Sequence, residues 1–359
     1  MIDPIFYFVL IIVVMALVHF PGRSPGYHTR YLAAILPGTC ILFYAAVEAF
    51  YFALVSLLLS TVLFFIARSA KNRSVKNYLP YAGLLVILYP DYYKAWQQGN
   101  ILFIGSAFFI VRQFVTVKES IKHRIVGREF IVSNVLATFF FASEFTGPIF
   151  SGVIANRELK QVRKIDHQVG VFKLLEGFAF VLAFSAAIVM FQTKVDDFSG
   201  NQSIPFLDFL LNFIASPLLA FMFVFTTFFG YSKIAEGVAE LLGFSVPENF
   251  RQPHKSTSFS DFWQRWHRSM ADFVMKYLYL PISIQLRNPK LGLMAAFVFM
   301  GLWHNVSLGY LFWGVAHGSA LIWLQPLVSS PRCPQLLSRA VTLSYVVYVS
   351  YLANYWLVL

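Results

Sequence analysis

Long apolar runs separated by short polar connections recur along the chain. They cover residues 4–20, 31–67, 78–90, 100–117, 129–151, 168–192, 204–229, 291–303, 308–325 and 336–358. A helix needs about 20 apolar residues to cross the hydrocarbon core of a bilayer, so most of these runs can span it and residues 31–67 can form two helices. We therefore predict an all-α, polytopic membrane protein with about ten or eleven membrane segments in a single domain, residues 1–359.

The run at residues 129–151 departs from this pattern. Basic clusters flank it at both ends, and Glu144 and the sequence Thr146-Gly147-Pro148 interrupt it. Because irregular backbone is not tolerated against lipid, we predict a broken or re-entrant segment that is buried in protein. A carboxylate at membrane depth is a candidate functional group, and an ion pair with a nearby arginine is the alternative interpretation of Glu144.

Two further segments have the pattern of helices that lie at the membrane interface. In residues 231–244 apolar side chains repeat at helical spacing, with the charged residues elsewhere. In residues 258–280, Ser258 and Asp261 have the spacing of a capping box, and Arg268 and Asp272 are spaced as an i, i+4 ion pair. We predict one interfacial helix from each segment.

Composition and charge agree with a membrane location. The chain is 58% hydrophobic and 13% charged, and its net charge of +11 comes from basic residues in the connections between apolar runs. The positive-inside rule places such connections on the cytoplasmic side. We interpret the charge as orientation, together with attraction for anionic lipid headgroups or an acidic partner, and not as a nucleic-acid surface.

Two smaller features concern processing and cross-linking. The first apolar run lacks a basic n-region and a small-residue cleavage site, so we expect it to remain as a membrane helix. Cys40 lies in an apolar run and Cys333 in a basic connection, so we expect no structural disulfide.

Candidate chemistry concentrates in residues 247–318, which hold four of the eight histidines. His304 lies in the apolar stretch 291–325, where a histidine is costly unless it is hydrogen-bonded or lines a watery cavity. Imidazole is the usual general base near neutral pH, and a purely structural hydrogen bond is the alternative interpretation. His267, His304 and His317 are distant in sequence and have few carboxylates near them, so we expect no metal site.

Several common catalytic motifs are missing from the sequence. It contains no glycine-rich phosphate loop, no His-Glu-x-x-His and no Gly-x-Ser-x-Gly. Their absence argues against a nucleotide-driven transporter, a zinc protease and a serine hydrolase of the common type.

A series of short motifs carries a resemblance to a known family. They are Thr146–Ile149, Gly230–Gly237, Leu241–Phe244, Pro247–Arg251, Asp261–His267, Tyr277–Pro281, Gly301–His304 and Trp313–Gly318. In this order they resemble the membrane-bound O-acyltransferase family, in particular its bacterial branch of alginate O-acetylation and teichoic-acid D-alanylation proteins. The ordered match covers about residues 140–320, and the first 130 residues match only as hydrophobic spans. Two residues depart from the pattern of this branch. Lys233 stands where the branch often has Asp, and Asn305 stands where Gly commonly follows the histidine.

The resemblance implies a ring of helices around a thin central layer that is pierced by a tunnel. It implies that His304 of the Trp-His motif is catalytic and that His267 is the second recurrent histidine. The candidates for the tunnel or for oxyanion stabilisation are Trp303, Asn305, His317 and Glu144. Arg265, Arg268 and Lys276 are candidates for docking the donor, although the positive-inside bias explains their charge nearly as well.

The expected function is acyl transfer across the membrane. The resemblance implies that a cytosolic thioester, on an acyl carrier protein or coenzyme A, donates an acyl group to a hydroxyl on the opposite face. We expect a cell-envelope polysaccharide or an accessory transferase as the accepting partner, no bound cofactor, and a multi-pass location in the inner (plasma) membrane. The alternatives are acylation of a lipid or small secreted metabolite, or a transporter with His304 and Glu144 as a proton relay, which the lack of an inverted repeat disfavours.

Overall fold

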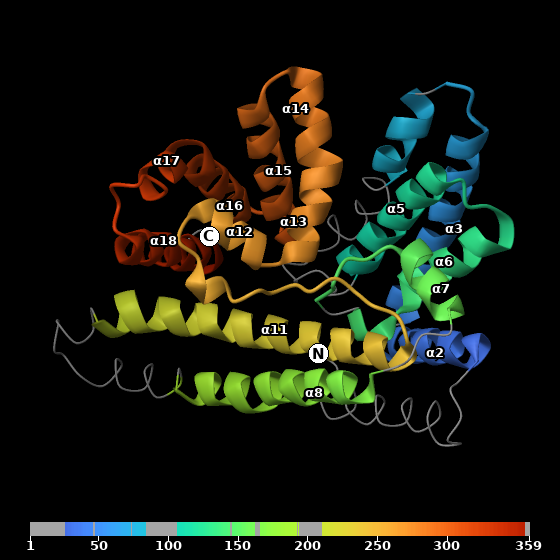
Figure 1. Ribbon diagram of the computed structural model, residues 1–359, viewed down its shortest axis with the longest axis horizontal. Coiled ribbons are helices and arrows are strands. Elements are labelled where there is room, and N and C mark those ends of the chain that lie inside the picture. Colours follow the sequence, from blue (N-terminus) through green and yellow to red (C-terminus); the bar gives the residue numbers. More distant parts are fainter. Residues whose placement is uncertain are drawn as a thin grey trace. The chain divides into compact units, whose positions relative to one another are not determined.

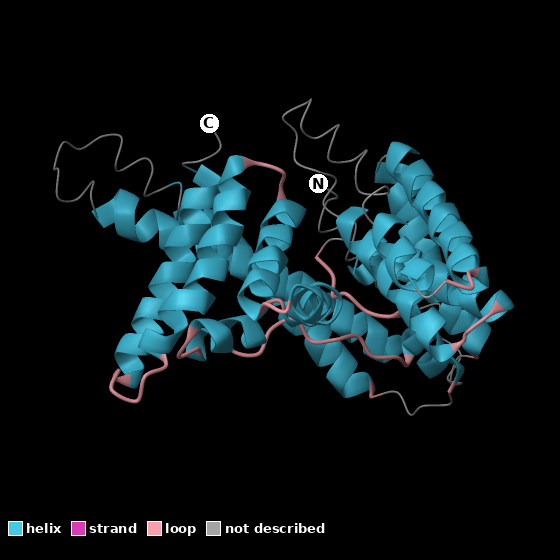
Figure 2. Ribbon diagram, turned by 90° about the horizontal axis from the view of Figure 1, so that it is seen from above, coloured by secondary structure: helices cyan, strands magenta, loops and turns pink. Residues whose placement is uncertain are grey.

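The computed structural model describes residues 26–45, 47–72, 74–83, 106–143, 146–161, 166–191, 193 and 210–355. Over these residues the chain forms helices and loops and no strand, which confirms the predicted all-α class (Figures 1 and 2). Five described helices are long and apolar enough to cross a membrane: Tyr51–Ser69, His167–Phe191, Phe213–Leu242, Leu308–Val328 and Gln335–Asn354. The count of ten or eleven segments includes runs outside the described residues and stays a prediction.

Contacts between the residues group the chain into two compact units. The first unit contains residues 1–177 and 231–247, and the second contains residues 178–230 and 248–359. The single membrane domain stays a prediction.

The first unit is built from helices on both sides of the predicted break. Its helices are α2 (Tyr27–Ala45), α3 (Val47–Ser69), α5 (Ser106–His123), α6 (Gly127–Phe139), α7 (Gly152–Lys160) and α8 (His167–Phe178), with the 3-10 turn η1 (Phe141–Ser143) and the C-terminal part of α11 (Ser216–Leu242). The apolar run 31–67 therefore forms two helices, as predicted.

The break inside residues 129–151 is confirmed. Helix α6 ends at Phe139, and non-helical backbone at residues 146–151 leads into α7. Arg112 of α5 is fully buried and donates to the carbonyl oxygen of Ala137 at 2.7 Å and to that of Ser143 at 2.6 Å. Buried carbonyl groups at the end of α6 thus gain hydrogen bonds from a side chain. Glu144 lies outside the described residues.

Polar side chains also join the helices of this unit to one another. The Gln113 amide donates to Ser56 Oγ at 3.2 Å and to Thr138 Oγ1 at 2.7 Å, and Asn134 Nδ2 donates to Ser60 Oγ at 2.8 Å. Such hydrogen bonds between helices hold apolar bundles together where the hydrophobic effect is weak.

Residues 231–242 do not form a separate interfacial helix, so that prediction is wrong. Helix α11 runs without interruption through Gly230. The charged residues that suggested an interface satisfy one another, because Lys233 Nζ lies 3.0 Å and Lys173 Nζ 3.5 Å from Glu236 Oε2. Helices α8 and α11 come so close here that a Cβ added at Gly237 would lie 2.8 Å from the Gly170 carbonyl oxygen.

The second unit contains the histidine-rich region. Its helices are α12 (Phe259–Arg265), α13 (Arg268–Val274), α14 (Leu280–Leu286), α15 (Pro289–His304), α16 (Leu308–Ser319), α17 (Gln325–Val328) and α18 (Gln335–Tyr355), the N-terminal part of α11, the 3-10 turn η4 (Pro253–Lys255), and the π-helical segments η2 (Ala179–Phe184), η3 (Leu211–Ala215), η5 (Met275–Tyr279) and η6 (Ala320–Leu324). In Figure 1, α14 and α15 stand side by side as a helical hairpin. The apolar arms predicted at residues 291–303 and 308–325 correspond to α15 and to α16 with its continuation.

The second predicted interfacial helix, residues 258–280, is interrupted. The chain leaves the helix at Trp266 and His267, and His267 adopts the left-handed conformation with φ of 46°. The Ser258 cap is confirmed, because its hydroxyl accepts from the Asp261 N–H at 3.2 Å. The predicted ion pair of Arg268 with Asp272 is replaced by one with Glu248. Arg268 Nη1 lies 3.0 Å from Glu248 Oε2. A helical pattern in sequence does not reveal this turn.

Candidate active site

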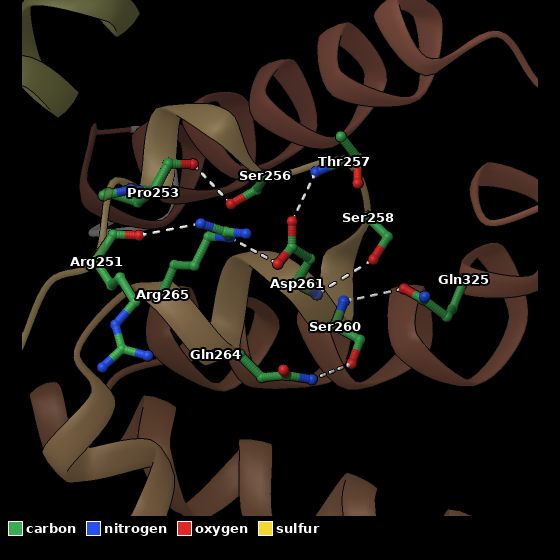
Figure 3. A network of polar contacts seen from close by, with 10 residues as sticks. All are labelled: Arg251, Pro253, Ser256, Thr257, Ser258, Ser260, Asp261, Gln264, Arg265 and Gln325. Carbon is green, nitrogen blue, oxygen red and sulfur yellow. Dashed lines mark hydrogen bonds and ion pairs between the residues drawn. The ribbon is translucent and has the colours of Figure 1, made fainter.

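A polar network fixes the start of α12, the helix before the turn at His267 (Figure 3). The Asp261 carboxylate accepts from the Thr257 N–H at 3.1 Å and from Arg265 Nε at 2.6 Å. The Ser260 N–H donates to the side-chain oxygen of Gln325 at 3.0 Å. These bonds satisfy the free N–H groups of the first turn and hold α12 in place.

The three side chains predicted to dock the donor have different surroundings. Arg265 is half-buried and paired with Asp261, and Arg268 is half-buried and paired with Glu248. Lys276 is exposed, with its Nζ 4.9 Å from the centre of the Tyr277 ring. A docking role for these residues stays a prediction.

His267 is buried at the turn between α12 and α13. Its side chain lies edge-to-face against Phe228, with ring centres 4.6 Å apart, and 6.3 Å from the ring of Trp303. The turn lies outside the five candidate spanning helices. Burial lowers the pKa of His267 well below its usual value, and the nearby His304 lowers this pKa further. The neutral imidazole is therefore the favoured form.

Close contact between α15 and α16 places His304. A Cβ added at Gly301 would overlap the Tyr310 carbonyl oxygen, and one added at Gly314 would overlap that of Phe297. Glycine at both positions lets the two backbones touch, as small residues do in membrane helix pairs. This contact explains why glycines precede His304 and follow Trp313 in the motifs.

His304 ends α15, and its side chain is exposed. Its ring centre lies 5.2 Å from that of Trp303, 5.8 Å from that of Tyr310 and 5.5 Å from that of Trp313. Within the second unit His304 and His267 line the same cavity, which has a volume of about 340 Å³. The structure thus brings together the two histidines that the sequence singles out, in an open site where a base can meet a substrate.

Three other predicted tunnel residues, Trp303, Asn305 and His317, are not among the described residues that line this cavity. Trp303 is buried, with its ring centre 6.3 Å from that of His267 and 5.2 Å from that of His304. Asn305 is exposed and follows α15 directly. His317 is buried behind the lining residues, with its ring centre 4.5 Å from that of Trp313 and 5.1 Å from that of Trp263. The oxyanion role of Asn305 stays a prediction.

The cavity also has a polar edge that the sequence analysis missed. Tyr310 Oη donates to Asn354 Oδ1 at 2.7 Å, and Trp313 Nε1 donates to Ser350 Oγ at 3.3 Å. All four residues line the cavity. Ser350 and Asn354 are four residues apart in the apolar α18, so helical spacing of polar residues was the available signal.

The model of the membrane-bound O-acyltransferase family matches residues 134–354. The chain is 37% identical to a probable alginate O-acetylase of Pseudomonas putida over 100 residues, 27% of this chain and 20% of that protein. It is 32% identical to a peptidoglycan O-acetyltransferase of Helicobacter pylori over 121 residues, 31% of this chain and 22% of that protein.

A longer match is to a teichoic acid D-alanyltransferase of Streptococcus thermophilus, with 25% identity over 256 residues, 64% of this chain and 59% of that protein. The chain spans only about a fifth of the length of the first two relatives. The family match, in contrast, covers more than half of the chain and includes His267, His304 and the whole cavity. The chain therefore belongs to the membrane-bound O-acyltransferase family.

Proposed function

We propose that this protein transfers an acyl group from a thioester donor to a hydroxyl acceptor, with His304 as the general base. The observation that carries the proposal is the position of His304 at the open end of α15, on a cavity that it shares with His267. A base must have its reactant within hydrogen-bond reach, and this cavity is large enough to admit one.

The proposed step needs no acyl-enzyme. A ring nitrogen of neutral His304 accepts the hydroxyl proton while the hydroxyl oxygen attacks the thioester carbonyl carbon. The tetrahedral intermediate then expels the thiolate, and the imidazolium returns the proton to the sulfur. A base positioned in this way contributes a rate factor of about 10² to 10⁴.

His267 has a supporting role in this proposal. Its neutral imidazole hydrogen-bonds a reactant beside His304, while aromatic side chains exclude water from the rest of the cavity. The indole rings of Trp263, Trp266 and Trp313 supply much of this aromatic surface.

The acceptor that we propose is a cell-envelope polysaccharide. The relatives are named for O-acetylation of alginate and peptidoglycan and for D-alanylation of teichoic acid. We infer a multi-pass protein of the inner (plasma) membrane, with a thioester on an acidic carrier protein or on coenzyme A as the cytosolic donor. An accessory transferase on the opposite face is a further partner.

The test is acyl transfer in membrane vesicles that contain the full chain. A labelled acyl thioester is supplied, and label is measured in separate polymer, lipid and small-molecule fractions. The proposal expects label in polymer and a loss of about 10² to 10⁴ in rate for His304→Ala. Gln264→Ala, at an exposed position in α12, is the control variant.

Three outcomes would contradict parts of this proposal. Full transfer by a well-expressed His304→Ala variant would exclude His304 as the base. Label in the lipid or small-molecule fraction would replace the polysaccharide acceptor. Transport of a solute without any acyl transfer would favour the transporter alternative.

A further inference from the structure

The segment Glu248–Arg251 lies along the turn that carries His267. The Arg251 N–H donates to the Arg265 carbonyl oxygen at 2.9 Å, and the Arg268 N–H donates to the Asn249 carbonyl oxygen at 2.9 Å. The two hydrogen bonds stand on opposite sides of Trp266 and His267 in the sequence. They therefore fix the backbone at both ends of the turn.

A buried side-chain bond strengthens this attachment. Ser269 Oγ donates to Asn249 Oδ1 at 2.6 Å, and the two residues are 2% and 0% exposed. A buried hydrogen bond is costly to break, because the group that remains cannot bond to water. The Asn249 side chain thus ties the segment Glu248–Arg251 to the first turn of α13.

The remaining residues of the segment contact the same turn. The ring centre of Phe250 lies 5.0 Å from that of Trp266, and Glu248 is paired with Arg268. The Pro247–Arg251 motif, which the resemblance included without assigning it a role, is therefore an attachment for the His267 turn.

The conformation of His267 requires such support. A φ of 46° is rare for a residue with a side chain, and such a conformation persists only where the surrounding structure over-determines it. An unsupported turn would return to a more common conformation. The His267 ring would then leave its position beside Phe228 and Trp303.

We propose that Asn249 is a positioning residue for His267. It acts on the reaction only by holding the turn that points the His267 ring at the cavity. The consequence for activity rests on the proposed function, but the consequence for the accessibility of His267 does not.

The first test measures that accessibility on the full chain in detergent. Diethyl pyrocarbonate modifies imidazole nitrogens, and mass spectrometry compares His267 with the exposed His254 in the same molecule. Because either substitution removes the buried hydrogen bond between Ser269 and Asn249, Asn249→Ala and Ser269→Ala are each expected to raise the relative modification rate of His267 by about tenfold. The control Gln264→Ala, at an exposed position of α12, should stay near the wild-type rate.

The second test measures acyl transfer. Asn249→Ala is expected to lower kcat by about tenfold with little change in KM, and to have no further effect in a His267→Ala background. A merely structural residue would lower the rate equally in both backgrounds, and that result would overturn the proposal. Unchanged modification of His267 in both alanine variants would also overturn it.

The two tests distinguish a failure of the proposed function from a failure of the positioning role of Asn249. Absence of transfer by the wild-type chain would refute the proposed function, but the accessibility test would still decide whether Asn249 positions His267. If Asn249→Ala does not fold, Ser269→Ala removes the same hydrogen bond from the other side and gives the decisive result.

Discussion

At the scale of single residues, buried polar side chains hold irregular backbone in place. Arg112 is fully buried and donates to carbonyl groups on both sides of Phe139, where α6 ends. Asn249 has a comparable task at the His267 turn. Arg112 donates to backbone carbonyl groups, and the Asn249 side chain accepts from the Ser269 hydroxyl. In each case a buried side chain from a distant segment bonds to a polar group beside irregular backbone, because unpaired polar groups are costly in an apolar interior.

Arg112→Leu is therefore expected to destabilise the first unit by about 3 to 5 kcal/mol, since it leaves several buried acceptors without a donor. Arg112→Lys should rescue only part of the loss, because an ammonium cannot reproduce the fork of the guanidinium. Thermal unfolding of the detergent-solubilised chain measures the effect. Lys122→Met, at an exposed position of the same helix, is the control; an equal loss in both variants would argue against this role of Arg112.

Tyr310→Phe tests the polar edge of the cavity. The change removes only the phenol oxygen that donates to Asn354, so the cavity keeps its shape. A hydrogen bond of this kind contributes about 1 kcal/mol to stability, and its loss leaves the Asn354 side-chain oxygen without this donor at the cavity edge. We therefore expect kcat/KM to fall by about fivefold, together with a small drop in unfolding temperature. Transfer kinetics measure the fall, with Tyr78→Phe at an exposed site of the first unit as the control. An unchanged kcat/KM would show that this edge does not meet a substrate.

At the scale of elements, the pattern of apolar residues predicts where helices form better than it predicts where they end or are interrupted. The pairs α2 with α3 and α15 with α16 are read directly from apolar length. Residues 231–244 are misread because Lys233 and Glu236 pair with each other inside a continuous helix. Residues 258–280 are misread because hydrogen bonds from Asn249 and Arg251, distant in sequence, support a turn at His267. His304 and His267 are candidate site residues from their motifs, but the cavity that they share with residues of α18 depends on tertiary packing.

The contact between α15 and α16 gives a prediction at this scale. Gly301→Ala forces the two backbones apart, because its Cβ would overlap the Tyr310 carbonyl oxygen. We expect a loss of about 1 to 3 kcal/mol in stability, together with reduced transfer because His304 moves with its helix. Gly318→Ala is the matched control, since its Cβ would first meet the flexible Met294 side chain at 3.0 Å. Equal unfolding temperatures for the two variants would contradict this account of the helix pair.

At the scale of the whole molecule, orientation decides which reactant arrives from which side. Lys122 lies in the last turn of α5, and the acidic pair Asp196-Asp197, which lies outside the described residues, follows the apolar run 168–192. The positive-inside rule predicts that Lys122 lies on the cytosolic side and Asp197 on the opposite side. This is the orientation that a cytosolic thioester donor requires.

Single cysteines introduced in a chain with Cys40 and Cys333 replaced test this orientation. In sealed vesicles of known sidedness, a membrane-impermeant maleimide should label Lys122→Cys only from the cytosolic face and Asp197→Cys only from the other. Ser133→Cys, at a fully buried position, should react only after denaturation and reports leakage of the reagent. Reversed labelling would place the basic connections outside the cell. The donor could then not reach the cavity from the cytosol by the proposed route, even if His304 remained the base.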